Sequence, residues 1–367
     1  MDSIQAFDDS NQLRESTQPL AAFYPFASAF RAKITAFPGM GIANEKCTGK
    51  EMFMVKMGRI LCPTDLSPES DEALRYAIAL ACAYEAKLML LYCRQPGVIV
   101  EWANSSQAAR LFEQALFKYM DANELKALDW EAVLTEGDDK GLAIATEAAK
   151  RNADLIVMRS RRRPHAAVWL GSTAETVSRT APCPVLVTHP GEREWVGLTT
   201  CEIDLRRLLV AYDNSADADL ALSYGTSLAQ QYQTEVHLLH VISDEAPAEP
   251  ELAWSEAGRE GSYEIAARRL QQAVSKETCL WCNIVTDVRC GHPANEILAY
   301  AKEHEIDLIC IGASGTGFSL DKLFGSTADR VLRRAPCPVL VSRPVKRCNV
   351  YESSVTLNRL LAASLHE

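Results

Sequence analysis

Residues 307–315 have the sequence Asp-Leu-Ile-Cys-Ile-Gly-Ala-Ser-Gly, and after nine further residues the chain continues with Gly325-Ser326-Thr327. The apolar run before Gly312 is typical of a strand buried on both faces of a parallel sheet. Glycine allows a backbone to approach an anion closely and to adopt positive φ, and a helix that begins with Gly-Ser offers N–H groups to that anion. The stretch therefore predicts an α/β fold with a phosphate-binding loop at the end of this strand.

Composition indicates an ordinary globular protein and excludes several classes. The chain has 367 residues, of which 48% are hydrophobic and 23% charged, and its net charge is −10 at pH 7. This length has room for two domains. A general nucleic-acid binder needs a basic surface, which an acidic chain does not favour. No apolar run reaches the roughly 20 residues of a membrane span. Acidic residues precede the apolar run at 20–30, unlike a secretory signal. We expect a cytoplasmic protein without a membrane partner.

Two pairs of segments repeat along the chain. Residues 59–67 parallel 207–215, an offset of 148 from Asp65 to Asp213, and Ala-Pro-Cys-Pro-Val-Leu-Val at 181–187 recurs at 335–341, an offset of 154. Self-similarity on this scale predicts a duplicated domain. We call residues 57–190 copy one and residues 205–345 copy two. The remaining parts are an N-terminal extension that we expect to be disordered (1–56), a linker (191–204) and a tail (346–367).

Strands and helices alternate in each copy. Continuous apolar strands separated by helices predict a doubly wound, five-stranded parallel sheet in each copy, with ligands at the carboxyl ends of the strands. Ser67 is expected to cap the first helix of copy one, with Pro68 at its first position. Helices are expected near 107–128, 142–151 and 173–179. The expected strands are 60–62, 88–91, 132–134, 155–158 and 185–187 in copy one, and 208–211, 236–241, 284–288, 308–311 and 339–341 in copy two.

With these residues in place, the chain resembles a tandem universal stress protein of the UspA family. The ATP-binding branch of that family carries G-x2-G-x9-G-[ST], which Gly312, Gly315, Gly325 and Ser326 match without a gap. The repeated Ala-Pro-Cys-Pro-Val-Leu-Val resembles the last strand of the family, which pairs two subunits edge to edge in family dimers. The resemblance implies a fold like that of the adenine nucleotide alpha hydrolases, with flavodoxin-like layering. It also implies that the two copies pair as a pseudo-dimer within one chain.

The resemblance implies an ATP site in copy two, with Mg²⁺. Asp213 would hydrogen-bond the adenosine portion, and Val241, at the end of the second strand, would meet the adenine edge. Gly312 and Gly315 would donate backbone N–H groups to the phosphates. The rest of the implied site is Ala211 and Ile311 at neighbouring strand ends, Gly325 for close approach, and Ser326 and Thr327 as hydroxyl and N–H donors. The structural alternative is that these glycines only form a turn.

Copy one departs from this pattern. Arg159 and Arg162 stand where copy two has Gly312 and Gly315, although Gly171-Ser172-Thr173 persists. We expect the arginine side chains to close the pocket and leave copy one as a structural partner. The alternative for the run 159–163 is an anion site of its own, since arginine binds phosphate with bidentate geometry; a solvated basic loop is favoured.

Other chemistry-bearing residues give weaker signals. Cys279 and Cys282 form a single C-x-x-C with Cys290 nearby, which is weak evidence for zinc. A helix exit that leads into a strand is the favoured interpretation, and redox chemistry stays open. His237 and His240 lie in an expected strand, where a core or edge role is favoured.

Three functions follow from these patterns. The first is an ATP-binding regulatory protein of the stress response, which acts through conformation or an unidentified protein partner. The second is a weak ATPase or self-phosphorylating enzyme; Asp321 and Lys322 lie near the glycine loop, but no Walker-type Gly-Lys-Thr is present. The third is a scaffold that binds no nucleotide. Association of two chains into a homodimer stays open.

Overall fold

The computed structural model describes residues 55–97, 105–160, 170–189, 193–198, 201–243, 256–315 and 324–344. The predicted tail, nearly all of the predicted N-terminal extension, and residues 161–163, 321 and 322 lie outside this part of the chain. Among the helices of the described segments, none has the length and apolar composition that a bilayer crossing requires.

The strands of both copies form one ten-stranded sheet in the order β3-β2-β1-β4-β5-β10-β9-β6-β7-β8. Neighbouring strands run parallel except β5 and β10, which are antiparallel. The strands of copy one are β1 (Arg59–Pro63), β2 (Lys87–Arg94), β3 (Trp130–Glu136), β4 (Leu155–Arg159) and β5 (Val185–Thr188). Those of copy two are β6 (Arg207–Ala211), β7 (Glu235–Ser243), β8 (Ile284–Gly291), β9 (Leu308–Gly312) and β10 (Val339–Ser342). The predicted fold class is confirmed. Each predicted strand is present and extends at least one residue beyond its predicted range.

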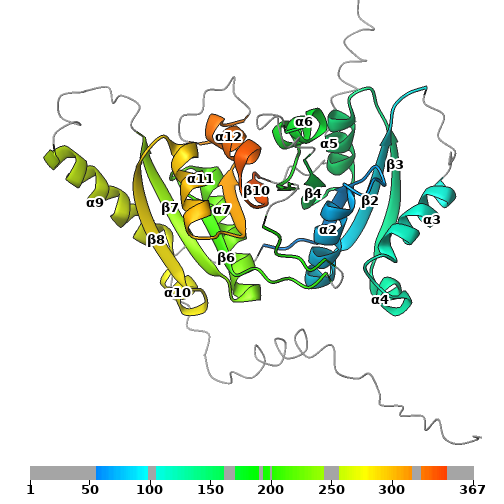
Figure 1. Ribbon diagram of the computed structural model, residues 1–367, viewed down its shortest axis with the longest axis horizontal. Helices are drawn as coiled ribbons and strands as arrows, with labels where there is room; N and C mark the ends of the chain where they lie inside the picture. The colour runs from blue at the N-terminus through cyan, green and yellow to red at the C-terminus, as the bar shows by residue number, and fades with distance from the viewer. Residues whose placement is uncertain are drawn as a thin grey trace, which may run out of the picture. The chain divides into compact units, whose positions relative to one another are not determined.

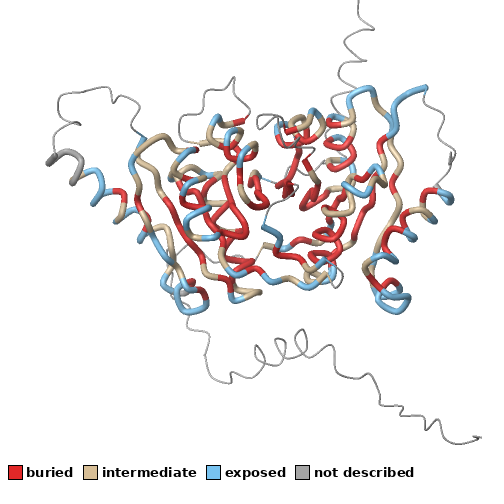
Figure 2. Tube along the Cα trace, in the orientation of Figure 1, coloured by how far each residue is buried: buried red, intermediate tan, exposed pale blue. Residues whose placement is uncertain are grey.

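Helices join the parallel strands and cover both faces of the sheet (Figure 1). Figure 2 shows buried residues along the strands and exposed residues on the outer side of α3. The helices of copy one are α2 (Asp71–Tyr84), α3 (Ser105–Leu116), α4 (Ala122–Ala127), α5 (Lys140–Lys150) and α6 (Ser172–Thr180). Those of copy two are α7 (Ala216–Tyr232), α9 (Glu256–Ala273), α10 (Lys276–Trp281), α11 (Pro293–Glu303) and α12 (Ser326–Arg334).

The two copies meet where β5 pairs with β10, as the resemblance implied. Val339 pairs with Val187 and Leu340 with Leu186. Leu186 and Leu340 belong to the core on one face of the sheet, and the flanking valines belong to the core on the other face. Because side chains alternate between faces along a strand, this short antiparallel pair continues both core layers from one copy into the other. It also removes two strand edges that would otherwise be exposed to aggregation.

One predicted helix is two. The helix expected at 107–128 is α3 and α4, because Asp121 interrupts it. The Asp121 side chain accepts hydrogen bonds from the backbone N–H groups of Asn123 and Glu124, and Glu124 Oε2 accepts from the Asp121 N–H at 2.7 Å. This reciprocal capping box starts a new helix.

The first helix of copy one begins later than predicted. Helix α2 begins at Asp71 with Ser70 as its N-cap residue, so Ser67 and Pro68 lie outside it and the prediction was wrong. In copy two, α7 begins at Ala216, and Ser215 accepts a hydrogen bond from the Ala218 N–H at 3.1 Å, as a capping serine should. Since Pro68 is the repeat counterpart of Ala216, α2 lacks three residues of helix that α7 has.

The segment between the copies packs on α2. Trp195 is 2% exposed, donates its backbone N–H to Tyr76 Oη at 3.2 Å and meets the Tyr76 ring edge-on. Arg75, also buried, donates to the carbonyl oxygen of Val196 at 3.0 Å and pairs with Glu194 at 3.0 Å. The described part of the connection is thus a packed element of the fold.

Candidate functional site

The predicted site of copy two lies at the carboxyl ends of three neighbouring strands. Ala211 at the end of β6 is in register with Ile311 in β9, and Tyr212 donates its N–H to the Leu239 carbonyl of β7 at 2.8 Å. Val241 does not end its strand as predicted, because β7 continues to Ser243. Parallel strands that end on one edge of a sheet bring these residues together, as expected for a doubly wound fold.

Asp213 and Gly315 face each other across this edge. The Asp213 Oδ1 atom accepts a hydrogen bond from the Ser215 N–H at 3.0 Å, which orients the carboxylate. A Cβ atom added to Gly315 would lie 2.5 Å from Asp213 Oδ2. His240 donates through Nδ1 to the Tyr212 carbonyl at 2.7 Å and so holds the backbone next to Asp213. Only glycine at 315 leaves this carboxylate in place.

The second glycine cluster lies against the first. A Cβ atom on Gly325 would be 3.4 Å from the Ala313 carbonyl oxygen and 4.0 Å from the Gly315 nitrogen, and the Gly325 N–H donates to that carbonyl at 2.8 Å. Gly325 is the N-cap residue of α12 and provides no side-chain cap. The first N–H groups of a helix lack partners within it, and Ser326 and Thr327 carry the first of these groups in α12.

The glycines of the loop serve close packing, and the expected positive φ is not found. None of Gly312, Gly315 and Gly325 adopts the left-handed region. A Cβ atom on Gly312 would lie 2.9 Å from Asp217 Cβ and 3.0 Å from the Asp217 carbonyl carbon, in the first turn of α7. Asp217 Oδ2 accepts a hydrogen bond from the Ser314 N–H at 3.0 Å. Gly312 therefore allows α7 to begin directly against the end of β9.

Copy one has an open cavity at the same place, where closure was predicted. The cavity has a volume of about 550 Å³. Its lining repeats the predicted site of copy two: Pro63, Asp65, Cys93, Met158, Gly171 and Thr173 stand at the positions of Ala211, Asp213, Val241, Ile311, Gly325 and Thr327. A volume of this order is usual for small-molecule sites.

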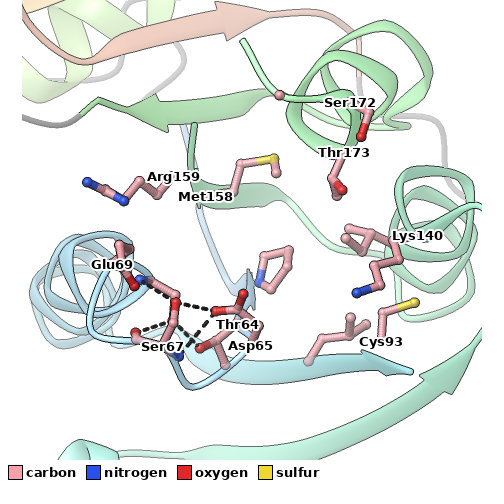
Figure 3. A pocket seen from close by; sticks show the side chains of 15 residues that line it. Thr64, Asp65, Ser67, Glu69, Cys93, Lys140, Met158, Arg159, Ser172 and Thr173 are labelled. Atoms are coloured by element: carbon pink, nitrogen blue, oxygen red, sulfur yellow. Dashed lines mark hydrogen bonds between the residues drawn. The ribbon is translucent and has the colours of Figure 1, made fainter. Parts of the chain in front are cut away.

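Arg159 does not fill the cavity, so that prediction was wrong. Figure 3 shows its guanidinium group pointing away from Lys140 and Thr173. Its Nε atom lies 2.8 Å from Glu72 Oε2, and the two side chains are only 15% and 13% exposed. Burial raises the pKa of Glu72, and the hydrogen bond and charge of Arg159 oppose that rise. Arg162, the second arginine expected to close the pocket, lies outside the described residues.

The late start of α2 has its cause here. Glu69 is the repeat counterpart of Asp217, which packs closely on Gly312. With Arg159 in place of Gly312, a helix beginning at Pro68 would bring its first turn into the arginine side chain. The chain at 67–70 instead forms a turn, in which the Ser70 N–H donates to the Ser67 carbonyl at 3.0 Å. Glu72, at the counterpart position of Leu220, then pairs with Arg159.

Lys140, at the start of α5, is a site residue that the sequence analysis missed. Figure 3 shows its amino group pointing into the cavity near Cys93. Burial raises the pKa of the Cys93 thiol, and the Lys140 charge acts in the opposite direction. Its position in the sequence could have identified it, because Lys140 follows a strand and therefore lies at the carboxyl edge of a parallel sheet. Copy two has Pro293 at the equivalent position.

The structure also places the histidine and cysteine residues singled out in the sequence. His237 is 4% exposed and hydrogen-bonds Tyr300 Oη and Glu235 Oε1, both at 2.9 Å, which confirms its core role; burial lowers its pKa. Cys279 and Cys282 are free thiols at the exit of α10 towards β8, as favoured. Within the described segments, no group of three or more histidine, cysteine or acidic residues is arranged to hold a metal ion.

Comparison with known proteins agrees with the repeat. The model of the universal stress protein family matches residues 56–189 and again 204–343. A universal stress protein of Mycolicibacterium smegmatis is 27% identical over 303 residues, which cover 78% of this chain and 97% of that protein. A universal stress protein of Methanocaldococcus jannaschii is 30% identical over 150 residues, 39% of this chain and 84% of that protein.

Solved structures share the fold. A universal stress protein from Archaeoglobus fulgidus superposes with a TM-score of 0.54 at 22% identity, covering 79% of this chain and all of that one. A protein of unknown function from Pseudomonas aeruginosa reaches a TM-score of 0.60 at 21% identity, covering 80% of this chain and 94% of that one. At these identities the likeness concerns the fold.

Proposed function

This chain belongs to the universal stress protein family, and on that premise we propose that it is an ATP-binding regulatory protein of the stress response. It binds ATP in copy two and acts through a change of conformation or through a protein partner. The observation that carries the proposal is the meeting of Asp213 with Gly315 and Gly325 at one edge of the sheet, although Asp213 is 102 residues away from Gly315 in the sequence.

The residues present fit a nucleotide. The Asp213 carboxylate, oriented by Ser215, is an acceptor for sugar hydroxyl groups. The missing side chain at Gly315 leaves room beside that carboxylate. The start of α12, without a side-chain cap, directs N–H groups and a partial positive charge at an anion. Bound Mg²⁺ would supply charge neutralisation for the phosphates.

The test is calorimetric titration of the full chain with ATP and Mg²⁺, compared with Gly315→Arg. The new side chain would displace the Asp213 carboxylate and fill the loop. We expect the unaltered chain to bind one ATP per chain. The affinity of the variant should be at least about 100-fold lower, equivalent to ~2.7 kcal/mol. Phosphate release during the titration would reveal the alternative function, ATP hydrolysis.

Gly261→Arg is the matched control. A Cβ atom on Gly261, in α9, meets nothing within 4 Å, so an arginine there adds the same charge without entering the site. Its affinity should equal that of the unaltered chain. Undiminished ATP binding by Gly315→Arg would contradict the proposed site, and no binding by the unaltered chain would favour a scaffold.

A further inference from the structure

The cavity of copy one contains a lysine side chain, Lys140, that is unpaired within the described part of the chain. Lys140 has no hydrogen bond or ion pair with any described residue, although its amino group points into the cavity. The other cation of the lining, Arg159, is paired with Glu72 at 2.8 Å. A lysine at the edge of a cavity, rather than on an open surface, provides a counter-ion for an anionic ligand.

Among the described residues, neither the carboxylate next to Lys140 in sequence nor those of the cavity lining form an ion pair with it. Asp139 Oδ1 accepts hydrogen bonds from the N–H groups of Gly141 and Leu142, at 2.8 and 3.1 Å, and so caps α5. Asp65 Oδ1 accepts from the Ser67 N–H at 3.2 Å and from its hydroxyl at 2.5 Å. Glu69, which also lines the cavity, is exposed to solvent. Lys140 therefore remains the cation of the described lining that is not paired with a carboxylate.

Lys140 is held next to the start of α6. A Cβ atom on Gly141 would lie 3.1 Å from the Thr173 carbonyl oxygen and 2.4 Å from Thr176 Cβ, so the first turns of α5 and α6 are in close contact. Thr173 and Ser172 also line the cavity. The amino group and the hydroxyl groups can thus bind the same anionic group, and the dipole of α6 adds to the attraction.

The charge present limits the anion. Lys140 contributes one positive charge and the start of α6 about half of one, while the carboxylates of Asp65 and Glu69 in the lining repel further negative charge, so the cavity favours an anion of about −1.5 to −2, such as a phosphomonoester at neutral pH, over a more highly charged one. Because Arg159 is neutralised by Glu72 and the glycine pair of copy two is missing, a longer phosphate chain would extend past Lys140 without a counter-ion among the described residues. The apolar part of the lining, which includes Leu91, Ile144 and Met158, suits an uncharged body.

We propose that the cavity of copy one is a second ligand site, which takes a compact phosphomonoester whose phosphate pairs with Lys140. Copy one is then a binding domain with a preference different from that of copy two. The inference rests on the proposed function only for the choice of a nucleoside as the body of the probe.

The experiment uses the full chain carrying Gly315→Arg, so that binding in copy two does not mask copy one. If copy two binds no nucleotide, that background behaves like the unaltered chain and the test is unaffected. AMP and adenosine are titrated separately by calorimetry, before and after the addition of Lys140→Ala. We expect AMP affinity to fall at least about tenfold, as for loss of a charge-assisted contact, while adenosine affinity stays the same.

Two controls sharpen the result. Lys150→Ala removes a lysine at the far end of α5, where it pairs with Glu147 at 3.4 Å and is 65% exposed, and should change neither affinity. Lys140→Arg keeps the charge and should retain most of the AMP affinity. Failure of AMP to bind, or equal AMP affinity with and without Lys140, would overturn the proposal.

Discussion

Helices α7 and α2 occupy the same place in the two copies, yet α7 begins at Ala216 and α2 at Asp71, the counterpart of Asp219. The difference originates one strand away. Gly312 lets α7 begin against the end of β9, whereas Arg159 occupies the equivalent space in copy one and pairs with Glu72. Loss of the glycine loop therefore did not close the pocket. Instead, α2 begins later than α7, and the Arg159 side chain pairs with Glu72 and leaves the cavity open.

The largest effect is expected from Arg159→Gly in copy one. This substitution leaves the largely buried Glu72 carboxylate without its partner, and removal of one partner of a buried pair costs about 3 kcal/mol. Urea unfolding of the full chain measures it. The double variant Arg159→Gly with Glu72→Leu, which restores both residues of copy two, should recover most of that loss. A double variant as unstable as the single one would contradict the pairing.

The same variant should show a pH dependence. Burial already raises the pKa of Glu72, and loss of Arg159 raises it further. Between the unfolded and folded pKa values, the folded state then holds a proton that the unfolded state has released. The free energy of unfolding therefore falls as pH rises through that interval, and the destabilisation should be smaller near about pH 5 than near about pH 8. Arg206→Ala, an arginine that is 76% exposed, is the control and should show no such trend.

An intermediate effect is expected from Gly312→Ala in copy two. The new Cβ would overlap Asp217 in the first turn of α7, and overpacking of this kind costs about 1–3 kcal/mol. Amide hydrogen exchange should show the first turn of α7 opening, so that α7 comes to resemble α2. Gly261→Ala, in open space within a helix, should instead stabilise the chain by about 0.5–1 kcal/mol. Equal stability of the two variants would contradict the packing role of Gly312.

The smallest effect is expected from Ser215→Ala, which removes the cap of α7. The Ser215 hydroxyl accepts from the Ala218 N–H at 3.1 Å, and loss of such a cap costs about 1 kcal/mol. Ser223→Ala, in the same helix, removes only a bond from its hydroxyl to the Asp219 carbonyl at 2.8 Å. It should be nearly neutral, because such bonds do not stabilise a helix. Equal losses in the two variants would show that the cap does not determine where α7 begins.

Much of the fold could be predicted because the signals are local. Apolar runs such as 308–311 predicted the strands, and the resemblance of the repeated 181–187 and 335–341 to the last strand of the family implied where the copies join. The candidate site of copy two was predicted from the glycine spacing and the family resemblance, and the structure brings Asp213, Gly315 and Gly325 together. Their roles in binding ATP stay predictions.

The state of copy one could not be predicted in this way. An arginine in place of a glycine indicates only that a long side chain begins there. The direction of the Arg159 side chain depends on Glu72, 87 residues earlier in the chain. It also depends on whether α2 can begin one turn later. Lys140 likewise becomes a site residue only because α5 packs against α6.

By itself, the sequence determined the α/β class, the duplication and the edge of the sheet where ligands would bind. Side-chain periodicity, strand length and glycine spacing are properties of adjacent residues, and they are visible without coordinates. Only the tertiary structure decided that the pocket of copy one is open and which charges of the described residues face it. A side chain's direction and pairing are set by close packing among residues distant in sequence, where a change of a few atoms moves a helix end.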